Sequence, residues 1–252
     1  GGWAPELVRM DVRTLEEMRL QFDHGAVAVT GWPMATAAQA ARLRHLRTEG
    51  NVDVVLKSVR LINQGQPTER IASAVAGDPT LLYRLLRYVN SVRFNLPTPI
   101  ASATDAITFL GHQKLKRWLV FILTSVGHRT PLRPTTFAAV RRGLMLEQLA
   151  QFSHNDAIAS ELFVCGILSL IDRMLGHPMH ELLNAICASD AMSGALVHGR
   201  GPYLPYLDMA RSLEAGFTYP IYEAAGQLAL GMGAINQALL KSMAAAFDIE
   251  QP

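Results

Sequence analysis

The sequence has little of what marks secreted, membrane-spanning or nucleic-acid-binding chains. Only two of its 252 residues are cysteine, Cys165 and Cys187, and they form no CxxC pair, so we expect no disulfide framework and a reducing, cytoplasmic location. The longest apolar runs, 118–126 and 162–171, fall well short of the roughly 20 residues that a membrane-spanning helix needs. The formal charge is only +2, with dispersed arginines, which counts against a nucleic-acid partner.

The sequence also lacks recognisable catalytic and cofactor motifs. It has no Gly-x-Ser-x-Gly nucleophile turn, and the glycines at 199–202 lack the spacing and the Lys-Ser/Thr of a phosphate-binding loop. The eight histidines are scattered, and only His177 and His180 stand close together, beside Glu181. A metal site there would need another ligand that the sequence does not offer, so surface loop histidines are the simpler interpretation. We therefore expect no metal and no cofactor.

What the sequence does have is apolar residues at helical spacing. Half of the residues are hydrophobic and 17% are charged, as in a folded globular chain. From residue 37 on, apolar positions recur every three or four residues between caps, prolines and glycines. Helices are predicted at 37–46, 52–62, from 68, from 79, from 102 to Gly111, at 115–126, 137–152, 156–175, 179–188, 190–197 and 203–215, and in a closing pair marked by Pro220 and Gly231. With a connector at 127–134, this pattern predicts an irregular all-α bundle in two halves, 37–127 and 133–252.

The best-defined helix lies within GDPTLLYRLLRYVNSVRF, residues 77–94. Asp78 is expected to accept hydrogen bonds from the free N–H groups at the helix start, and Pro79 fits the first helical position because it has no N–H to satisfy. Asn90 and Ser91 suit the helix exit, where their side chains are expected to bond the helix end or the next segment. The sequence therefore predicts where this helix begins and where it ends.

Five basic residues on or near this helix and the next predict a surface for an acidic partner or a nucleotide phosphate. They are Arg84, Arg87, Arg93, Lys114 and Arg117. The alternative interpretation is a solvated helix face with local ion pairs.

Residues 77–94 and the following PIASATDAITFLGHQKLKRWL, 99–119, resemble the signature of the HDOD family, a regulatory relative of the HD phosphohydrolases. In that family an Asp-Pro opens a Leu-rich helix that closes on Val-Asn-Ser, and the next helix carries Ala-Ile, Leu-Gly and a basic, aromatic turn. The signature falls here on Asp78, Pro79, Asn90, Ser91 and Gly111. The stretch LDMARSLEAG, 207–216, is similar to the tail of HDOD domains, where an acidic helix ends in Glu-x-Gly. The resemblance implies an HD-like bundle over residues 37–252.

The segment VCGILSLIDRML, 164–175, is similar to the helix that carries the His-Asp metal pair of HD phosphohydrolases. In those enzymes the pair binds metals that activate water. Here the two positions hold Ser169, a poor substitute for imidazole, and Leu170, which has no lone pair to offer a cation. The helix at 137–152, expected to supply another His, has none. The resemblance therefore implies a degenerate metal site and a chain that is not an enzyme.

Residues 1–36 differ from the rest. Thr14 is expected to cap a short helix with Leu15, Met18 and Phe22 on one face, and 25–33 predicts one strand. A helix followed by FDHGAVAVTGWP is similar to the end of an EAL domain, the cyclic-di-GMP phosphodiesterase fold. The resemblance implies that residues 1–36 are the C-terminal remnant of an EAL-like domain and 37–252 the HDOD domain of an EAL-HDOD arrangement.

The function that these resemblances imply is that of a non-catalytic bacterial signal-transduction module. It would act through contacts with signalling proteins that the sequence does not identify, and an attached EAL domain would link it to cyclic di-GMP. Two alternatives stay open. One is a residual metal-dependent HD-type phosphohydrolase using His177 and His180, and the other is a nucleic-acid-binding helical domain using the arginines and lysines of the predicted basic surface.

Overall fold

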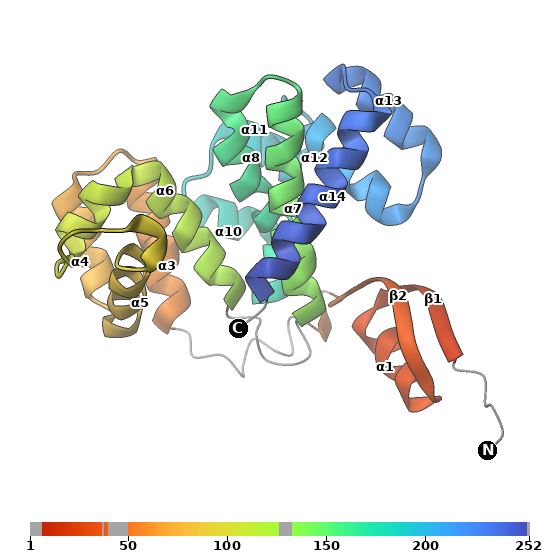
Figure 1. Cartoon of the computed structure of the whole chain (residues 1–252), viewed down its shortest axis with the longest axis horizontal. Helices are drawn as coiled ribbons and strands as arrows, with labels where there is room; N and C mark the ends of the chain where they lie inside the picture. The colour runs from red at the N-terminus through yellow and green to blue at the C-terminus, as the bar shows by residue number, and fades with distance from the viewer. Residues whose placement is uncertain (1–6, 37, 40–49, 126–132, 251–252) are drawn as a thin grey trace.

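The computed structural model describes residues 7–36, 38–39, 50–125 and 133–250. An N-terminal unit of strands β1 (Leu7–Thr14) and β2 (Ala26–Met34) with helix α1 (Leu15–Asp23) lies at one end of the helical bundle (Figure 1). The first half of the bundle contains α3 (Gly50–Asn63), α4 (Thr68–Ala76), α5 (Pro79–Val89), the short 3-10 helix η1 (Val92–Phe94) and α6 (Ala103–Ser125). The second half contains α7 (Arg133–Phe152), α8 (Asp156–Leu168), α9 (Ile171–Leu175), α10 (Met179–Ala185), α11 (Asp190–Val197), α12 (Leu204–Ala215), α13 (Thr218–Leu228) and α14 (Met232–Glu250). The predicted all-α class is confirmed. The helix predicted at 37–46, apart from residues 38–39, and residues 127–132 of the connector predicted at 127–134 lie outside the described residues.

The N-terminal unit has one strand more than the sequence analysis predicted. The helix cap is as expected, since Thr14 Oγ1 accepts a hydrogen bond from the Glu17 N–H at 3.0 Å. The strand β2 pairs in parallel with β1, which supplies the sheet partner that a single strand needs. At Gly31, with φ 127°, a Cβ would lie 2.4 Å from the Val12 carbonyl oxygen, so this close strand approach requires glycine.

Helix α5 begins and ends where the sequence predicts. The Asp78 carboxylate accepts from the N–H groups of Thr80 at 2.8 Å and Leu81 at 3.1 Å, with Pro79 in the first turn. Its stripe of Leu81, Leu85 and Val89 is buried in the core. At the exit, the Asn90 side chain accepts from the Ile100 N–H and donates to the Ile100 carbonyl, both at 2.8 Å. Asn90 therefore ties the helix end to the segment that leads into α6.

The Asp78 cap offers a direct stability test. We expect Asp78→Ala to lower the free energy of unfolding by about 1 kcal/mol, because two helix N–H groups lose their acceptor. The matched control is Ser91→Ala, since Ser91 holds the N-cap position of η1 but makes no cap hydrogen bond through its side chain. Urea unfolding monitored by circular dichroism measures both changes. Equal shifts for the two variants would contradict the capping role of Asp78.

Two predicted boundaries of the first half are confirmed, and one boundary of the second half is wrong. Helix α4 begins at Thr68, as predicted, although its N-cap residue is Pro67 and the Thr68 hydroxyl lies 3.2 Å from His112 Nε2. Gly111 ends the first helical segment of α6, as predicted, because its φ of 74° and ψ of 159° are non-helical and a kink separates this segment from the next. Helix α7 starts at Arg133, four residues earlier than predicted, because a proline is tolerated in a first turn.

The second half is also divided differently from the prediction. The single helix predicted at 156–175 is two helices, α8 and α9, separated at Ser169 and Leu170. The apolar run continues through this break, so periodicity gave no sign of it. The closing pair is marked by Pro220 and Gly231 as predicted, because Pro220 lies in the first turn of α13 and Gly231 directly precedes α14. Over the ranges that the structure describes, no helix combines the length and the apolar character needed to cross a membrane.

The centre of the second half is the contact between α7 and α8. A Cβ on Gly166 would lie 2.6 Å from Gly143 Cα, so two helix backbones meet where both residues are glycine. Helix α7 also packs against α14, α12 and β2, and α6 packs against α3, α4 and α8. This arrangement places the residues after Gly166, at the end of α8, beside the polar side chains of α7.

Candidate functional site

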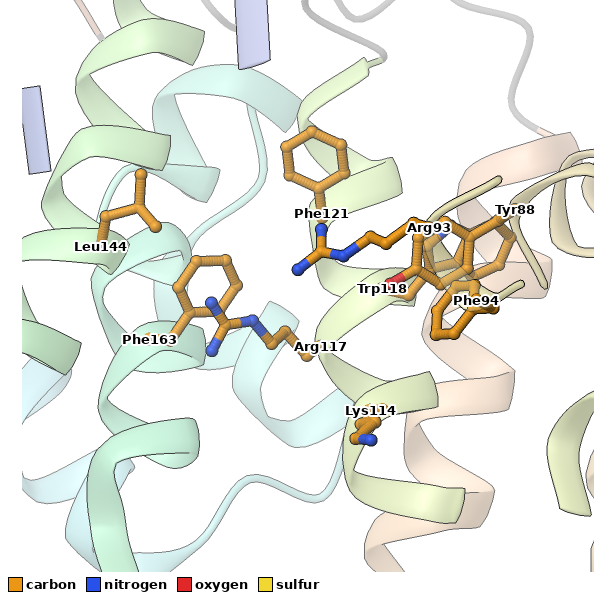
Figure 2. A pocket seen from close by; sticks show the side chains of 9 residues that line it. All are labelled: Tyr88, Arg93, Phe94, Lys114, Arg117, Trp118, Phe121, Leu144 and Phe163. Carbon is orange, nitrogen blue, oxygen red and sulfur yellow. The ribbon is translucent and has the colours of Figure 1, made fainter. Parts of the chain in front are cut away.

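A cavity of about 790 Å³ opens between α5, η1, α6, α7 and α8 (Figure 2). It brings together three of the five residues of the predicted basic surface, Arg93, Lys114 and Arg117, whereas Arg84 and Arg87 are not among its lining residues. Aromatic side chains make most of the remaining wall. The lining residues are Tyr88, Arg93, Phe94, Lys114, Arg117, Trp118, Phe121, Leu144 and Phe163. We call this cavity the aromatic-basic pocket.

One wall of the aromatic-basic pocket is a cluster of rings that fixes the signature helix against α6. The rings of Tyr88 and Trp118 are stacked with centroids 5.9 Å apart, and Phe94 meets Tyr88 edge-on at 5.2 Å. Phe94 also meets Phe109 edge-on at 5.5 Å. Such offset and edge-on pairs are favourable ring geometries. The residues that follow the Asn90 exit are therefore held as a defined wall.

The three basic residues of the pocket differ in their partners. The Arg117 guanidinium lies 3.7 Å from the centroid of the Phe163 ring and donates through both Nη atoms to the Glu147 carboxylate, at 2.7 Å for the Nη2–Oε2 bond. Arg93 and Lys114 are exposed, and no carboxylate of the described residues pairs with either of them. The pocket therefore carries two positive charges that the described part of the protein does not neutralise.

A second polar site lies where the resemblance puts the His-Asp metal pair. Ser169 Oγ accepts a hydrogen bond from Arg142 Nη1 at 2.7 Å and donates to the Gly166 carbonyl at 2.7 Å. Leu170 is buried beside it at the start of α9. A guanidinium group of α7 therefore contacts the Ser169 side chain, at the position that the resemblance aligns with the histidine of the His-Asp pair.

Arg142 belongs to a buried ion cluster that the sequence analysis missed. The Glu214 carboxylate of α12 is shared by Arg141 and Arg142, and Arg142 Nε lies 3.1 Å from Glu214 Oε1. The side chains of Arg141, Arg142 and Glu214 are 0%, 4% and 5% exposed. Burial lowers the pKa of Arg141, and the charge of Glu214 opposes this effect. Two features of the sequence could have indicated this ion cluster. They are the Arg141-Arg142 pair inside an apolar helix and Glu214 in the Glu-x-Gly end of the family tail. We call these three residues the buried Arg-Glu cluster.

The N-terminal unit is seated directly on the buried Arg-Glu cluster. The Trp32 ring of β2 stacks on Arg141, with the guanidinium carbon 3.9 Å from the ring centroid. Arg13 Nη1 and Nη2 donate to the carbonyl oxygens of Glu214 and Ala215 at 3.4 and 3.3 Å. A smaller cavity of about 270 Å³, lined in part by Trp32, Arg142 and Ser169, lies at this contact.

The candidate histidines do not converge on further ligands. His177 and His180 are both exposed, and His177 Nδ1 lies 4.0 Å from Glu181 Oε2, its neighbour one turn later. Within the described ranges, no three His, Cys, Asp or Glu side chains group in a way that could hold a metal ion.

The two cysteines differ in environment, and this difference can be tested. Burial raises the pKa of Cys165 to about 12, whereas Cys187 is exposed, with Gln64 Nε2 3.6 Å from its sulfur. Because the thiolate is the reactive form, a raised pKa leaves Cys165 protonated at pH 8 and unreactive. We expect Ellman's reagent to modify one thiol per native chain and two after denaturation in guanidinium chloride. Rapid modification of two thiols in the native protein would contradict this assignment.

Two curated bacterial proteins are similar to most of this chain. It is 23% identical over 182 residues to the protein named "Cyclic di-GMP phosphodiesterase CdgJ" of Vibrio cholerae serotype O1, covering 72% of this chain and 42% of that protein. It is 26% identical over 159 residues to "Uncharacterized protein YuxH" of Bacillus subtilis (strain 168), covering 61% of this chain and 38% of that protein. The chain thus spans about two fifths of the length of these relatives. No solved structure matches it.

The first relative corrects an expectation. The prediction that this chain is not an enzyme is contradicted by its similarity to a protein named as a phosphodiesterase. The prediction was wrong because it relied on Ser169 and Leu170, which concern one kind of metal site only.

The family follows from the comparison with protein-family models. The model described as "HDOD domain" matches residues 51–193, a range that includes the signature helix α5, the kinked helix α6 and the Ser169 position. The match covers more than half of the chain and accounts for both the helical fold and the motif order. This chain therefore belongs to the HDOD domain family.

Proposed function

We propose that this chain acts in cyclic-di-GMP signalling and that its HDOD domain transmits the signal through contacts with other protein surfaces. The first half of the proposal is supported by the name of the relative CdgJ. The second half is carried by one observation, the seating of the N-terminal unit on the buried Arg-Glu cluster. In this proposal, residues 1–36 end an EAL-like domain and residues 37–252 form the HDOD domain.

The buried Arg-Glu cluster connects the N-terminal unit with several helices of the bundle. Arg141 touches both Trp32 of β2 and Glu214 of α12, and Arg142 touches both Glu214 and Ser169 at the α8–α9 break. A movement of β2 would therefore change the surroundings of the buried Arg141 charge. The residues of the buried Arg-Glu cluster and their partner Ser169 lie on α7, on α12 and at the α8–α9 break. Buried charges tolerate few arrangements, so such a cluster favours discrete packing states over gradual deformation.

The test measures cyclic di-GMP in cells. Expression of the chain in a bacterium that makes this nucleotide should change its cellular concentration, measured by mass spectrometry. The double variant Arg13→Ala/Trp32→Ala removes two side chains of the N-terminal unit that contact α7 and α12, and it should cancel most of that change. The control is Arg19→Ala, because Arg19 is 84% exposed on α1 and its ion pair within the described residues is the one with Asp23. Circular dichroism checks that each variant is folded.

Three results would decide against the proposal. An unchanged nucleotide level with the wild-type chain would contradict a role in cyclic-di-GMP signalling. A change that survives in the double variant would contradict transmission through this contact. Hydrolysis of cyclic di-GMP by the purified chain, at a rate that explains the whole cellular change, would replace transmission by direct catalysis in these residues.

A further inference from the structure

We propose that the aromatic-basic pocket is a binding site for a purine nucleotide, with the base among its rings and the phosphate at Arg93 and Lys114. This inference goes beyond the proposed function and does not depend on it, because the pocket lies between α5, η1, α6, α7 and α8, whereas the N-terminal unit contacts other residues, on α7, α9 and α12. It follows from three properties of the pocket: its charge, its rings and its size.

The charge of the pocket predicts an anionic group on the ligand. Arg117 is already neutralised by Glu147, while Arg93 and Lys114 have no carboxylate partner among the described residues. Figure 2 shows the Arg93 guanidinium in the open space between the rings. An arginine and a lysine together suit a phosphate, since arginine offers a planar pair of donors and lysine a point charge. A wholly apolar ligand would leave both cations unmatched.

The rings of the pocket predict a flat aromatic group on the same ligand. Tyr88, Phe94 and Trp118 lie on one side of the space and Phe163 and Leu144 on the other, with Phe121 at a third edge (Figure 2). Tyr88, Phe94 and Phe121 are partly exposed, so their rings are accessible from the cavity. Stacking of a nucleobase on such a ring contributes about 1–3 kcal/mol per base. Inorganic phosphate would leave these rings unused.

The size of the pocket suits a small molecule. Its volume of about 790 Å³ falls in the range of roughly 300–1,000 Å³ that small-ligand pockets occupy. A nucleic-acid polymer would need a longer basic track, and Arg84 and Arg87, which could extend one along α5, do not line the cavity. A mononucleotide or a cyclic dinucleotide combines the phosphate, the flat base and the compact size.

Isothermal titration calorimetry of the purified chain tests the proposal. The probes are GMP, cyclic di-GMP, guanosine and inorganic phosphate, each titrated up to millimolar concentration. At least one of the two nucleotides should bind at one per chain, and guanosine and phosphate should bind about tenfold or more weakly, because each offers only half of the contacts. Arg93→Gln/Lys114→Gln should weaken nucleotide binding by about tenfold or more, since two charge-assisted contacts are lost. The matched control is Arg87→Gln, an exposed α5 arginine outside the pocket.

Every other result overturns the proposal. Failure of both nucleotides to bind removes the ligand class. Equal affinity in the wild type and the Arg93→Gln/Lys114→Gln variant places the nucleotide at another site. Phosphate binding as tightly as GMP removes the role of the rings. Binding of a single-stranded oligonucleotide with a steep salt dependence, without binding of either nucleotide, makes the surface a nucleic-acid interface. None of these results bears on the cellular test of the N-terminal contact.

Discussion

Glu214→Gln is expected to lower the free energy of unfolding by about 3–5 kcal/mol, because it leaves two buried guanidinium groups without their shared carboxylate. Arg141 and Arg142 are 0% and 4% exposed, so water cannot replace the lost partner. Arg142 would keep its bond to Ser169, but that hydroxyl carries no charge. Glutamine preserves the volume of the side chain, so the loss reports on charge and not on packing. Urea unfolding of wild type and variant measures the difference.

The control for this variant is Asp208→Asn, on the same helix α12. Asp208 lies 3.6 Å from Arg211, but both side chains are nearly half exposed, so the pair is screened by solvent and its loss should cost less than about 1 kcal/mol. If both variants shift stability equally, the buried Arg-Glu cluster is no more than an ordinary surface ion pair. Adding Arg142→Met to Glu214→Gln should recover part of the loss, because it removes one of the two unpaired charges.

The parts of the fold that the sequence predicts well are those set by neighbouring residues. Helix α5 is predicted at both ends because Asp78 caps N–H groups two and three residues ahead and Asn90 is itself the C-cap residue. Strand β1 is missed because its partner β2 lies across a helix, and only one of its residues, Val12, is buried, so it shows no regular alternation. The α8–α9 break is missed because Leu170 and Ile171 continue the apolar run through it.

The candidate sites, too, are predictable from the sequence where neighbouring residues form them and not where distant segments do. Lys114 and Arg117 are three residues apart on α6, so sequence spacing alone places them on one face, and Arg93 joins them through the short η1. The aromatic rings that complete the pocket come from four separate elements, which no local pattern connects. The buried Arg-Glu cluster joins α7 to α12 across 72 positions of the chain. The local signs of it were the Arg-Arg pair within an apolar helix and the Glu-x-Gly end of the family tail, since charged side chains are rarely buried without a partner.

Gly166→Ala is expected to destabilise the protein by about 1–3 kcal/mol or more, because the added methyl group meets backbone atoms that cannot move independently. Its Cβ would lie 2.6 Å from Gly143 Cα, 2.7 Å from Gly143 N and 2.8 Å from the carbonyl carbon of Arg142. Helix α8 would have to move away from α7 along the centre of the second half. The Gly166 carbonyl also accepts the hydrogen bond of Ser169, so the shift should disturb the Arg142 contact as well.

Gly226→Ala on α13 provides the matched control for this variant. No heavy atom lies within 4 Å of a Cβ at Gly226, so the same added methyl group is free of contacts there. Alanine loses less backbone entropy than glycine on entering a helix, which should stabilise the protein by roughly 0.5–1 kcal/mol. The two glycine-to-alanine changes should therefore shift the unfolding midpoint in opposite directions. A loss of stability at Gly226 equal to that at Gly166 would show that the α7–α8 approach is not what makes glycine necessary. Opposite shifts would show that the close approach of α7 and α8 is what requires glycine at position 166.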